Sequence, residues 1–262
     1  MSTQLPLTLR WPAQQRFASF VAGDNGAAVD LLQRAAAEPD ALWVFACGPR
    51  GSGKTHLLVA ACAAAAELGR SAQYLSLRKL AKKMGSGSFS PLADAPSRSG
   101  RAENEPDPIF SLRALGGSEL LALDDVDAIA GNAEIEHALF DLYNRCKVEK
   151  STLLFAAAAP PAQLGLGLRD LVSRLSACAQ APLRPLDDTA RREALKQRAQ
   201  ARGLLLDDGV IDWLFVHAER DLGSLTGWLE RIDRASLAAK RRVTVPFLRQ
   251  LLEEQSEEKK NG

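Results

Sequence analysis

The octapeptide GPRGSGKT, residues 48–55, has the spacing G-x-x-x-x-G-K-[ST] and decides how the rest of the chain is interpreted. It follows the apolar run LWVFACG (42–48) and opens the helical stretch THLLVAACAAAAEL (55–68). A buried strand, a glycine-rich turn and a helix in this order favour a phosphate-binding loop over the alternative, a glycine-rich turn with an accidental lysine.

Each part of this loop has its own chemical task. The glycines let the backbone curl so that successive N–H groups point at phosphate oxygens, and the helix N-terminus adds partial positive charge. Lys54 is expected to reach the β and γ phosphates, and Thr55 to bind Mg²⁺. The predicted nucleotide-binding residues are Gly48, Gly51, Ser52, Gly53, Lys54 and Thr55.

An acidic pair ends a second apolar run, LLALDDVD (120–127). Carboxylates at a strand end can approach a phosphate loop on a parallel neighbour, so we expect Asp124 to complete the Mg²⁺ shell and Asp125 to orient water. A merely solvated strand end is the alternative, and the phosphate loop upstream disfavours it.

Further apolar runs alternate with helical stretches. SAQYLSL (71–77) and STLLFAAA (151–158) are strand candidates, and IEHALFDLYNRCKVE (135–149) has apolar residues at helical spacing. This pattern predicts an α/β fold, a parallel sheet with flanking helices. The end of the last run, LLFAAAAPP (153–161), offers only alanines where phosphate-loop hydrolases place a polar residue to hold water or the γ-phosphate, so weak intrinsic hydrolysis is expected.

Two regions depart from this alternation. Residues 84–108 are rich in Gly, Ser and Pro, which favours a mobile surface insertion over a functional lid. From Asp187 onward strand signals almost vanish, and helical periodicity predicts a small all-helical domain. The expected organisation is an N-terminal peptide at 1–11, a nucleotide-binding domain at 12–186, the helical domain at 187–253 and a charged tail at 254–262.

Composition excludes several classes of function. The 262 residues are 46% hydrophobic with a formal net charge of +1, so no whole-molecule field draws the chain onto nucleic acid or anionic lipid. No apolar run approaches the length of a membrane span, and the start lacks a secretion signal, so a cytoplasmic location is expected. The cysteines are widely spaced, which predicts buried reduced thiols at Cys47, Cys62, Cys146 and Cys178.

Taken together, the motifs resemble the AAA+ ATPases and, within them, the DnaA lineage of bacterial replication proteins. GPRGSGKTHLL (48–58), LLALDDVD (120–127) and LRDLVSRL (168–175) occur in the family order and precede a helical lid. PPAQLGLGLRDLVSRL (160–175) and IDRASLAAKRRVTVPFLRQLL (232–252) look most like the Hda family of regulatory inactivators. The resemblance covers roughly residues 12–253 and implies an AAA+ P-loop domain followed by a lid.

The resemblance also gives a role to the opening peptide QLPLTL (4–9). It looks like the peptide with which family members dock on the β sliding clamp of the replicase. Gln4 can hydrogen-bond at the mouth of a pocket while Leu5, Leu7 and Leu9 serve as apolar anchors, and proline limits the entropy lost on ordering. The alternative is an N-terminal arm that packs on its own domain, which is the role expected for Trp11 and Phe17.

Arg174 in LRDLVSRL resembles the arginine finger of AAA+ assemblies, whose guanidinium stabilises charge developing at a neighbour's γ-phosphate. Arg169 lies five residues earlier on another helical face, and a surface cation is the alternative for either. The resemblance implies that the neighbour is ATP-bound DnaA. The implied function is negative regulation of replication initiation, with DNA and the nucleoid contacted only indirectly through the clamp.

The lid departs from the family pattern at one position. The expected nucleotide-sensing arginine is replaced by Gly223, and Arg220, one turn earlier, is the candidate substitute. With the alanines at 156–159, this predicts that ADP or ATP with Mg²⁺ is bound and poorly hydrolysed. A stand-alone AAA+ motor or loader, a clamp-tethered adaptor and a homo-oligomer remain open as alternatives.

Overall fold

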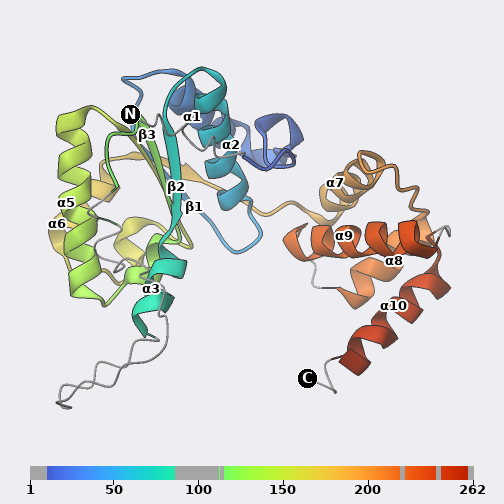
Figure 1. Cartoon of the computed structure of the whole chain (residues 1–262). Coiled ribbons are helices and arrows are strands. Elements are labelled where there is room, and N and C mark those ends of the chain that lie inside the picture. Colours follow the sequence, from blue (N-terminus) through green and yellow to red (C-terminus); the bar gives the residue numbers. More distant parts are fainter. Residues whose placement is uncertain (1–10, 86–111, 113–114, 219–221, 240–242, 259–262) are drawn as a thin grey trace, which may run out of the picture. The chain divides into compact units, whose positions relative to one another are not determined.

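The computed structural model describes residues 11–85, 112, 115–218, 222–239 and 243–258 (Figure 1). The chain divides into two units, Met1–Arg184 and Pro185–Gly262. Each unit has a hydrophobic core of its own and is described by itself.

The first unit is built on a five-stranded parallel sheet with the order β2-β3-β4-β1-β5. All residues of β1, β3 and β4 are buried, because helices cover both faces of the sheet and every side chain needs an apolar neighbour. The strands are β1 (Val44–Cys47), β2 (Ala72–Ser76), β3 (Leu120–Asp124), β4 (Thr152–Ala157) and β5 (Ala179–Pro182).

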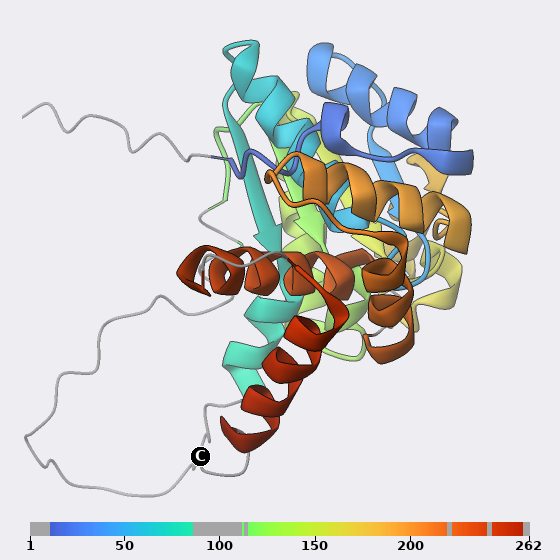
Figure 2. The same ribbon diagram turned by 90° about the vertical axis from the view of Figure 1, so that its right-hand side faces the viewer.

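The two faces of the sheet have separate cores. On one face α1 and α2 run side by side (Figures 1 and 2). Leu32 and Leu57 of these helices belong to the same buried cluster as Ala46 and Leu154 of the sheet. The helices of the opposite face are α3, α5 and α6. The helices of this unit are η1 (Phe17–Ser19), η2 (Gly23–Asn25), α1 (Gly26–Ala37), α2 (Lys54–Glu67), α3 (Leu77–Gly85), η3 (Val126–Ile129), α5 (Ala133–Glu149), η4 (Pro161–Gln163) and α6 (Arg169–Ser176).

Parallel pairing explains where the functional residues gather. The carboxyl ends of parallel strands meet at one edge of the sheet, so the loop after β1 and the acidic end of β3 lie at the same edge. In the pairing of β2 with β3, Ser76 lies opposite Asp124. Polar residues at the end of β2 therefore reach the same edge.

The second unit is all-helical, as the sequence predicts. It consists of α7 (Asp188–Gln200), α8 (Asp208–His217), α9 (Leu222–Ala239) and α10 (Val245–Glu258). Asp187 and Asp207 cap the first two helices by accepting hydrogen bonds from backbone N–H groups in the first turn. The predicted α/β class, a parallel sheet with flanking helices followed by a small helical domain, is confirmed.

Several expected segments fall outside the described residues, namely the peptide 1–10 and all but the start of 84–108. The division between the units comes after Arg184, close to the expected 186, and α10 continues to Glu258, into the stretch assigned to a tail. All four cysteines are buried and free, which confirms that prediction. No helix in the described part of the chain combines the length and the hydrophobicity of a membrane span.

Candidate functional site

The phosphate loop owes its shape to three glycines. Gly51 and Gly53 have φ angles of 80° and 93°, in the left-handed region that side chains disfavour. At Gly48 an added Cβ would lie 2.3 Å from the carbonyl oxygen of Leu183, so only glycine fits there. The sequence prediction that these glycines shape the backbone is thus matched by specific contacts.

The start of α2 is covered by the segment that precedes α1. An added Cβ at Gly53 would lie 2.5 Å from Phe20, whose ring is tilted against His56 with centroids 5.2 Å apart. The Nε2 atom of His56 lies 2.9 Å from the carbonyl oxygen of Arg16. Trp11 and Phe17 pack against the same core, as expected.

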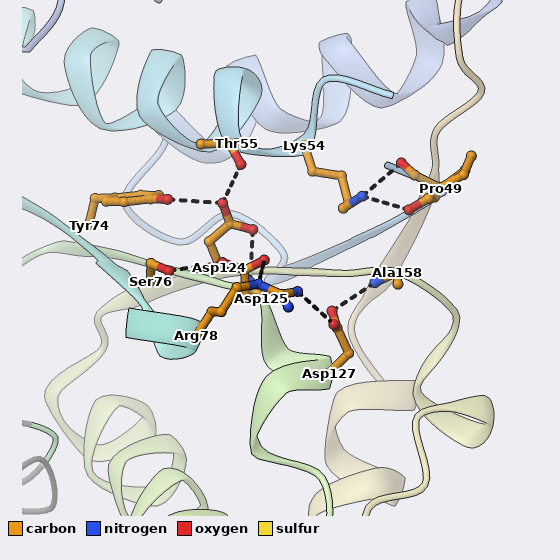
Figure 3. A network of polar contacts seen from close by, with 11 residues as sticks. Pro49, Lys54, Thr55, Tyr74, Ser76, Arg78, Asp124, Asp125, Asp127 and Ala158 are labelled. Carbon is orange, nitrogen blue, oxygen red and sulfur yellow. Dashed lines mark hydrogen bonds and ion pairs between the residues drawn. The ribbon is translucent and has the colours of Figure 1, made fainter. Parts of the chain in front are cut away.

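The ammonium of Lys54 bends back over its own loop (Figure 3). It donates hydrogen bonds to the carbonyl oxygens of Gly48 and Pro49 at 2.6 and 2.9 Å. Burial lowers its pKa, while the negative charges of Asp124 and its neighbours oppose that shift. The buried hydroxyl of Ser52 has no hydrogen-bond partner within the described structure. A buried hydroxyl and a cation held only by carbonyls are groups that a phosphate can satisfy.

Asp124 is the centre of the polar network at the end of β3 (Figure 3). Its Oδ2 accepts hydrogen bonds from the Thr55 hydroxyl at 2.5 Å and the Tyr74 hydroxyl at 2.9 Å, and Oδ1 accepts from the backbone N–H of Asp125 at 2.8 Å. Burial raises the pKa of the Asp124 carboxyl, and these hydrogen bonds act against the rise. Burial and the nearby carboxylate raise the pKa of Tyr74 as well.

The donor set suits Mg²⁺. Hydroxyl and carboxylate oxygens are hard ligands, and Mg²⁺ is usually held by one or two protein oxygens with substrate phosphates and water completing its shell. Thr55 and Asp124 supply such a pair beside the phosphate loop. Within the described part of the chain, no three His, Cys, Asp or Glu side chains form a closed metal site.

The carboxylate of Asp125 is held by hydrogen bonds from neighbouring side chains. Asp125 has a left-handed φ of 58°, and its carboxylate accepts hydrogen bonds from Ser76 at 2.9 Å and from Nε of Arg78 at 3.1 Å. Arg78 also pairs with Asp127 at 3.0 Å, and Asp127 accepts the backbone N–H of Ala158 at 3.0 Å (Figure 3). Both Asp125 oxygens are thus engaged, and its expected water-orienting role stays a prediction.

Sequence reasoning missed the residues that surround the acidic pair. Tyr74, Ser76 and Arg78 come from β2 and the start of α3, next to β3 in the sheet. The available signal was their place at the end of the apolar run 71–77, because the neighbouring strand ends at the same edge.

Arg174 lies on α6 and contacts two residues of α5. Its guanidinium carbon is 5.2 Å from the ring centroid of Phe140 and 5.4 Å from that of Tyr143. Leu171 and Leu175 are fully buried and anchor the helix, so the arginine is left partly exposed on its other side. No carboxylate of the described residues forms an ion pair with Arg174. Arg169, the neighbouring candidate, is exposed at the first position of α6.

The structure therefore brings Lys54, Thr55, Asp124 and Asp125 together at one sheet edge and places Arg174 on a separate helix. Gly223 lies exposed in the first turn of α9. The remaining predicted site residues lie outside the described residues and are Gln4, Leu5, Leu7, Leu9 and Arg220.

The fold resembles domain III of the Thermotoga maritima replication initiation protein DnaA, with a TM-score of 0.72 and 19% identity over 94% of this chain and 98% of that chain. Residues 188–252 match the family model described as Hda, lid domain. The second unit is therefore similar to the Hda lid domain, and the chain as a whole shares the fold of DnaA domain III.

Other solved structures share this architecture with lower TM-scores. AMPPCP-bound DnaA from Aquifex aeolicus aligns with a TM-score of 0.62 and 22% identity over 85% of this chain and 66% of that chain. The Thermotoga maritima RuvB Holliday junction branch migration motor aligns at 0.56 and 17% over 88% of this chain and 68% of that chain. At these identities, the likeness shows a shared fold.

Proposed function

We propose that this Hda-like AAA+ protein is a negative regulator of bacterial replication initiation, which stimulates hydrolysis of DnaA-bound ATP with Arg174 as an arginine finger. The observation that carries the proposal is the environment of the Arg174 guanidinium. This guanidinium rests on two aromatic rings without a carboxylate partner among the described residues, on a protein whose lid matches the Hda family. A cation held in this way is available to a partner's phosphate.

Nucleotide binding is the second part of the proposal. The loop glycines, Lys54 and the orphaned Ser52 hydroxyl suit the phosphates of ADP or ATP, and Thr55 and Asp124 suit Mg²⁺. DnaA from Aquifex aeolicus, which has the same fold, binds AMPPCP. Mg²⁺ would neutralise phosphate charge, while Lys54 moves from its loop carbonyls to the phosphates.

The bound nucleotide serves assembly more than turnover. Asp125 is engaged by Ser76 and Arg78, and β4 ends in alanines that cannot hold an attacking water. Hydrolysis needs a water-orienting group that is free to reach the γ-phosphate. The chain's own hydrolysis is therefore slow, and its catalytic arginine acts on another protein's nucleotide.

Docking on the β sliding clamp through Gln4, Leu5, Leu7 and Leu9 would restrict this activity to newly replicated DNA. An extended peptide with alternating apolar anchors suits a clamp pocket. DNA would then be contacted only through the clamp, and the chain would associate with the nucleoid in that way.

The test is a single-turnover assay of ATP pre-bound to DnaA, with this protein and DNA-loaded clamp added singly and together. Stimulation is expected only when both are present. Replacing Leu5 and Leu7 with alanine should abolish the stimulation of hydrolysis seen with the clamp. The matched change Thr8→Ala should preserve this stimulation. Equal hydrolysis with and without this protein would contradict the proposal.

A stand-alone AAA+ motor or loader is the second candidate, favoured by the intact loop and the Thr55–Asp124 pair. Such a motor must turn over its own ATP. Steady hydrolysis by the purified chain alone, lost on Lys54→Ala, would support the motor and count against the regulator.

A further inference from the structure

The first turn of α5 contains a buried carboxylate outside the nucleotide site. Glu136 is 1% exposed, although it lies in the first helical turn, where glutamate usually faces water. No lysine or arginine of the described residues forms an ion pair with it. A buried charge without a counter-ion is costly unless hydrogen bonds compensate it.

Two backbone N–H groups from different loops provide this compensation. Gly131 donates to Oε1 at 3.0 Å and Leu168 donates to Oε2 at 2.8 Å. The backbone at Gly167 passes closely, since a Cβ added there would lie 3.6 Å from Oε2. Each oxygen is therefore committed to a separate segment of the chain.

The two segments connect the functional parts of the first unit. Gly131 follows η3, the short helix that begins directly after Asp125. Leu168 is the N-cap residue of α6, and its side chain makes no capping hydrogen bond. Glu136 thus joins the loop that leaves the acidic strand to the start of the helix that carries Arg174.

We propose that Glu136 is the positioning residue for Arg174. The helix α6 has only eight residues, so the fixed N–H of Leu168 determines where its first turn begins. Phe140 lies one turn after Glu136 on α5 and contacts the guanidinium of Arg174. The helix α5 therefore fixes both the start of α6 and the arginine side chain near its end. Charge-assisted hydrogen bonds are directional, and they place α6 more narrowly than apolar packing alone. The catalytic consequence rests on the proposed function.

The first variant is Glu136→Gln, which keeps the shape of the side chain. The amide has one accepting oxygen and one NH₂ group, so either Leu168 or Gly131 then faces a donor. We expect the maximal stimulated hydrolysis of DnaA-bound ATP to fall about tenfold, because small misplacements of a catalytic group are costly. The concentration of this protein that gives half-maximal stimulation should change little. Glu134→Gln, an exposed glutamate in the same turn, is the matched control and should behave as wild type.

An unchanged maximal rate of stimulated hydrolysis in Glu136→Gln would overturn the proposal.

An NMR measurement tests the placement without DnaA. The Nε–H resonance of Arg174, assigned by its disappearance in Arg174→Ala, should be shifted by the rings of Phe140 and Tyr143 in the wild type. This ring-current shift should shrink in Glu136→Gln. It should also shrink in Leu168→Pro, which removes the donor at a φ of −81° that proline tolerates and leaves Glu136 intact. An unchanged resonance in both variants would overturn the proposal, whereas a wild type that fails to stimulate DnaA would defeat only the proposed function.

Discussion

The hydroxyl of Thr55 donates a 2.5 Å hydrogen bond to the carboxylate of Asp124, across 69 positions of sequence. The donor opens α2 and the acceptor ends β3, so this contact ties the phosphate loop to the acidic strand. It also holds together the two oxygens expected to coordinate Mg²⁺. Both residues would then hold Mg²⁺ when a nucleotide is bound, and the ion would supply positive charge beside the phosphates.

The first prediction concerns this pair. Asp124→Asn removes the charge but keeps the shape, so nucleotide affinity in Mg²⁺ should fall about tenfold, equivalent to about 1.4 kcal/mol. Titration of a fluorescent ADP analogue, with Mg²⁺ and with a chelator, measures it. The variant's affinity should be the same in both conditions and should match wild type in chelator. A variant that keeps the full Mg²⁺ dependence would contradict the assignment.

The second prediction concerns Arg78, which holds both Asp125 and Asp127. Arg78→Ala frees the Asp125 carboxylate to accept a hydrogen bond from water, so the chain's own ATP hydrolysis should rise several-fold. Steady-state hydrolysis by the purified chain measures this. Lys79→Ala, a neighbouring exposed cation, should leave the rate unchanged. A rate that stays at or below wild type in Arg78→Ala would show that the pairing does not restrain Asp125.

Much of the sheet could be predicted because its signals are local. The apolar runs 42–48, 120–127 and 151–158 contain β1, β3 and β4, since a strand buried on both faces must be continuously apolar. The run 71–77 contains β2, a half-buried edge strand with a mixed sequence. The last strand, β5, was missed. Its sequence AQAP has no apolar run, and its place is set by pairing with β1.

The residues of the candidate site also fall into those that the sequence predicts and those that it does not. Lys54, Thr55 and Asp124 were found because their motifs are contiguous in sequence. Tyr74 and Glu136 were not, because each acts through a partner more than 30 positions away. Such partners follow from the packing of elements, which periodicity does not specify.

The third prediction concerns Arg70, which is 8% exposed at the other end of the first unit. Its guanidinium donates to the carbonyl oxygens of Ala35 and Ala36 near the end of α1 and to the Thr152 hydroxyl. Arg70→Ala leaves the two buried carbonyl oxygens without this donor, which should lower the free energy of unfolding by about 3 kcal/mol.

Hydrogen exchange of β1 and β4 amides measures that loss within the first unit, which avoids a two-state assumption for the whole chain. Lys196→Ala, which breaks an exposed ion pair with Asp208 in the second unit, is the control and should leave this exchange unchanged. Unchanged protection in Arg70→Ala would show that water or other donors satisfy the carbonyls.

The fourth prediction concerns the cysteines. Burial raises the pKa of Cys146 to about 11 and the pKa values of Cys62 and Cys178 to about 12. A raised pKa lowers the thiolate fraction, so at mildly alkaline pH these native thiols should react with a disulfide reagent more than about a hundredfold slower than in denaturing urea. Fast reaction of any of these three native thiols would contradict their burial.

The most direct measurement of the central claim compares two arginines of one helix in the hydrolysis of DnaA-bound ATP. With DNA-loaded clamp present, Arg174→Ala should reduce the stimulated rate by about a thousandfold or to the unstimulated rate, the loss typical of a missing arginine finger. Arg169→Ala, which removes an exposed cation from the same helix, should retain wild-type stimulation. Wild-type stimulation by Arg174→Ala, or a loss confined to Arg169→Ala, would contradict the account.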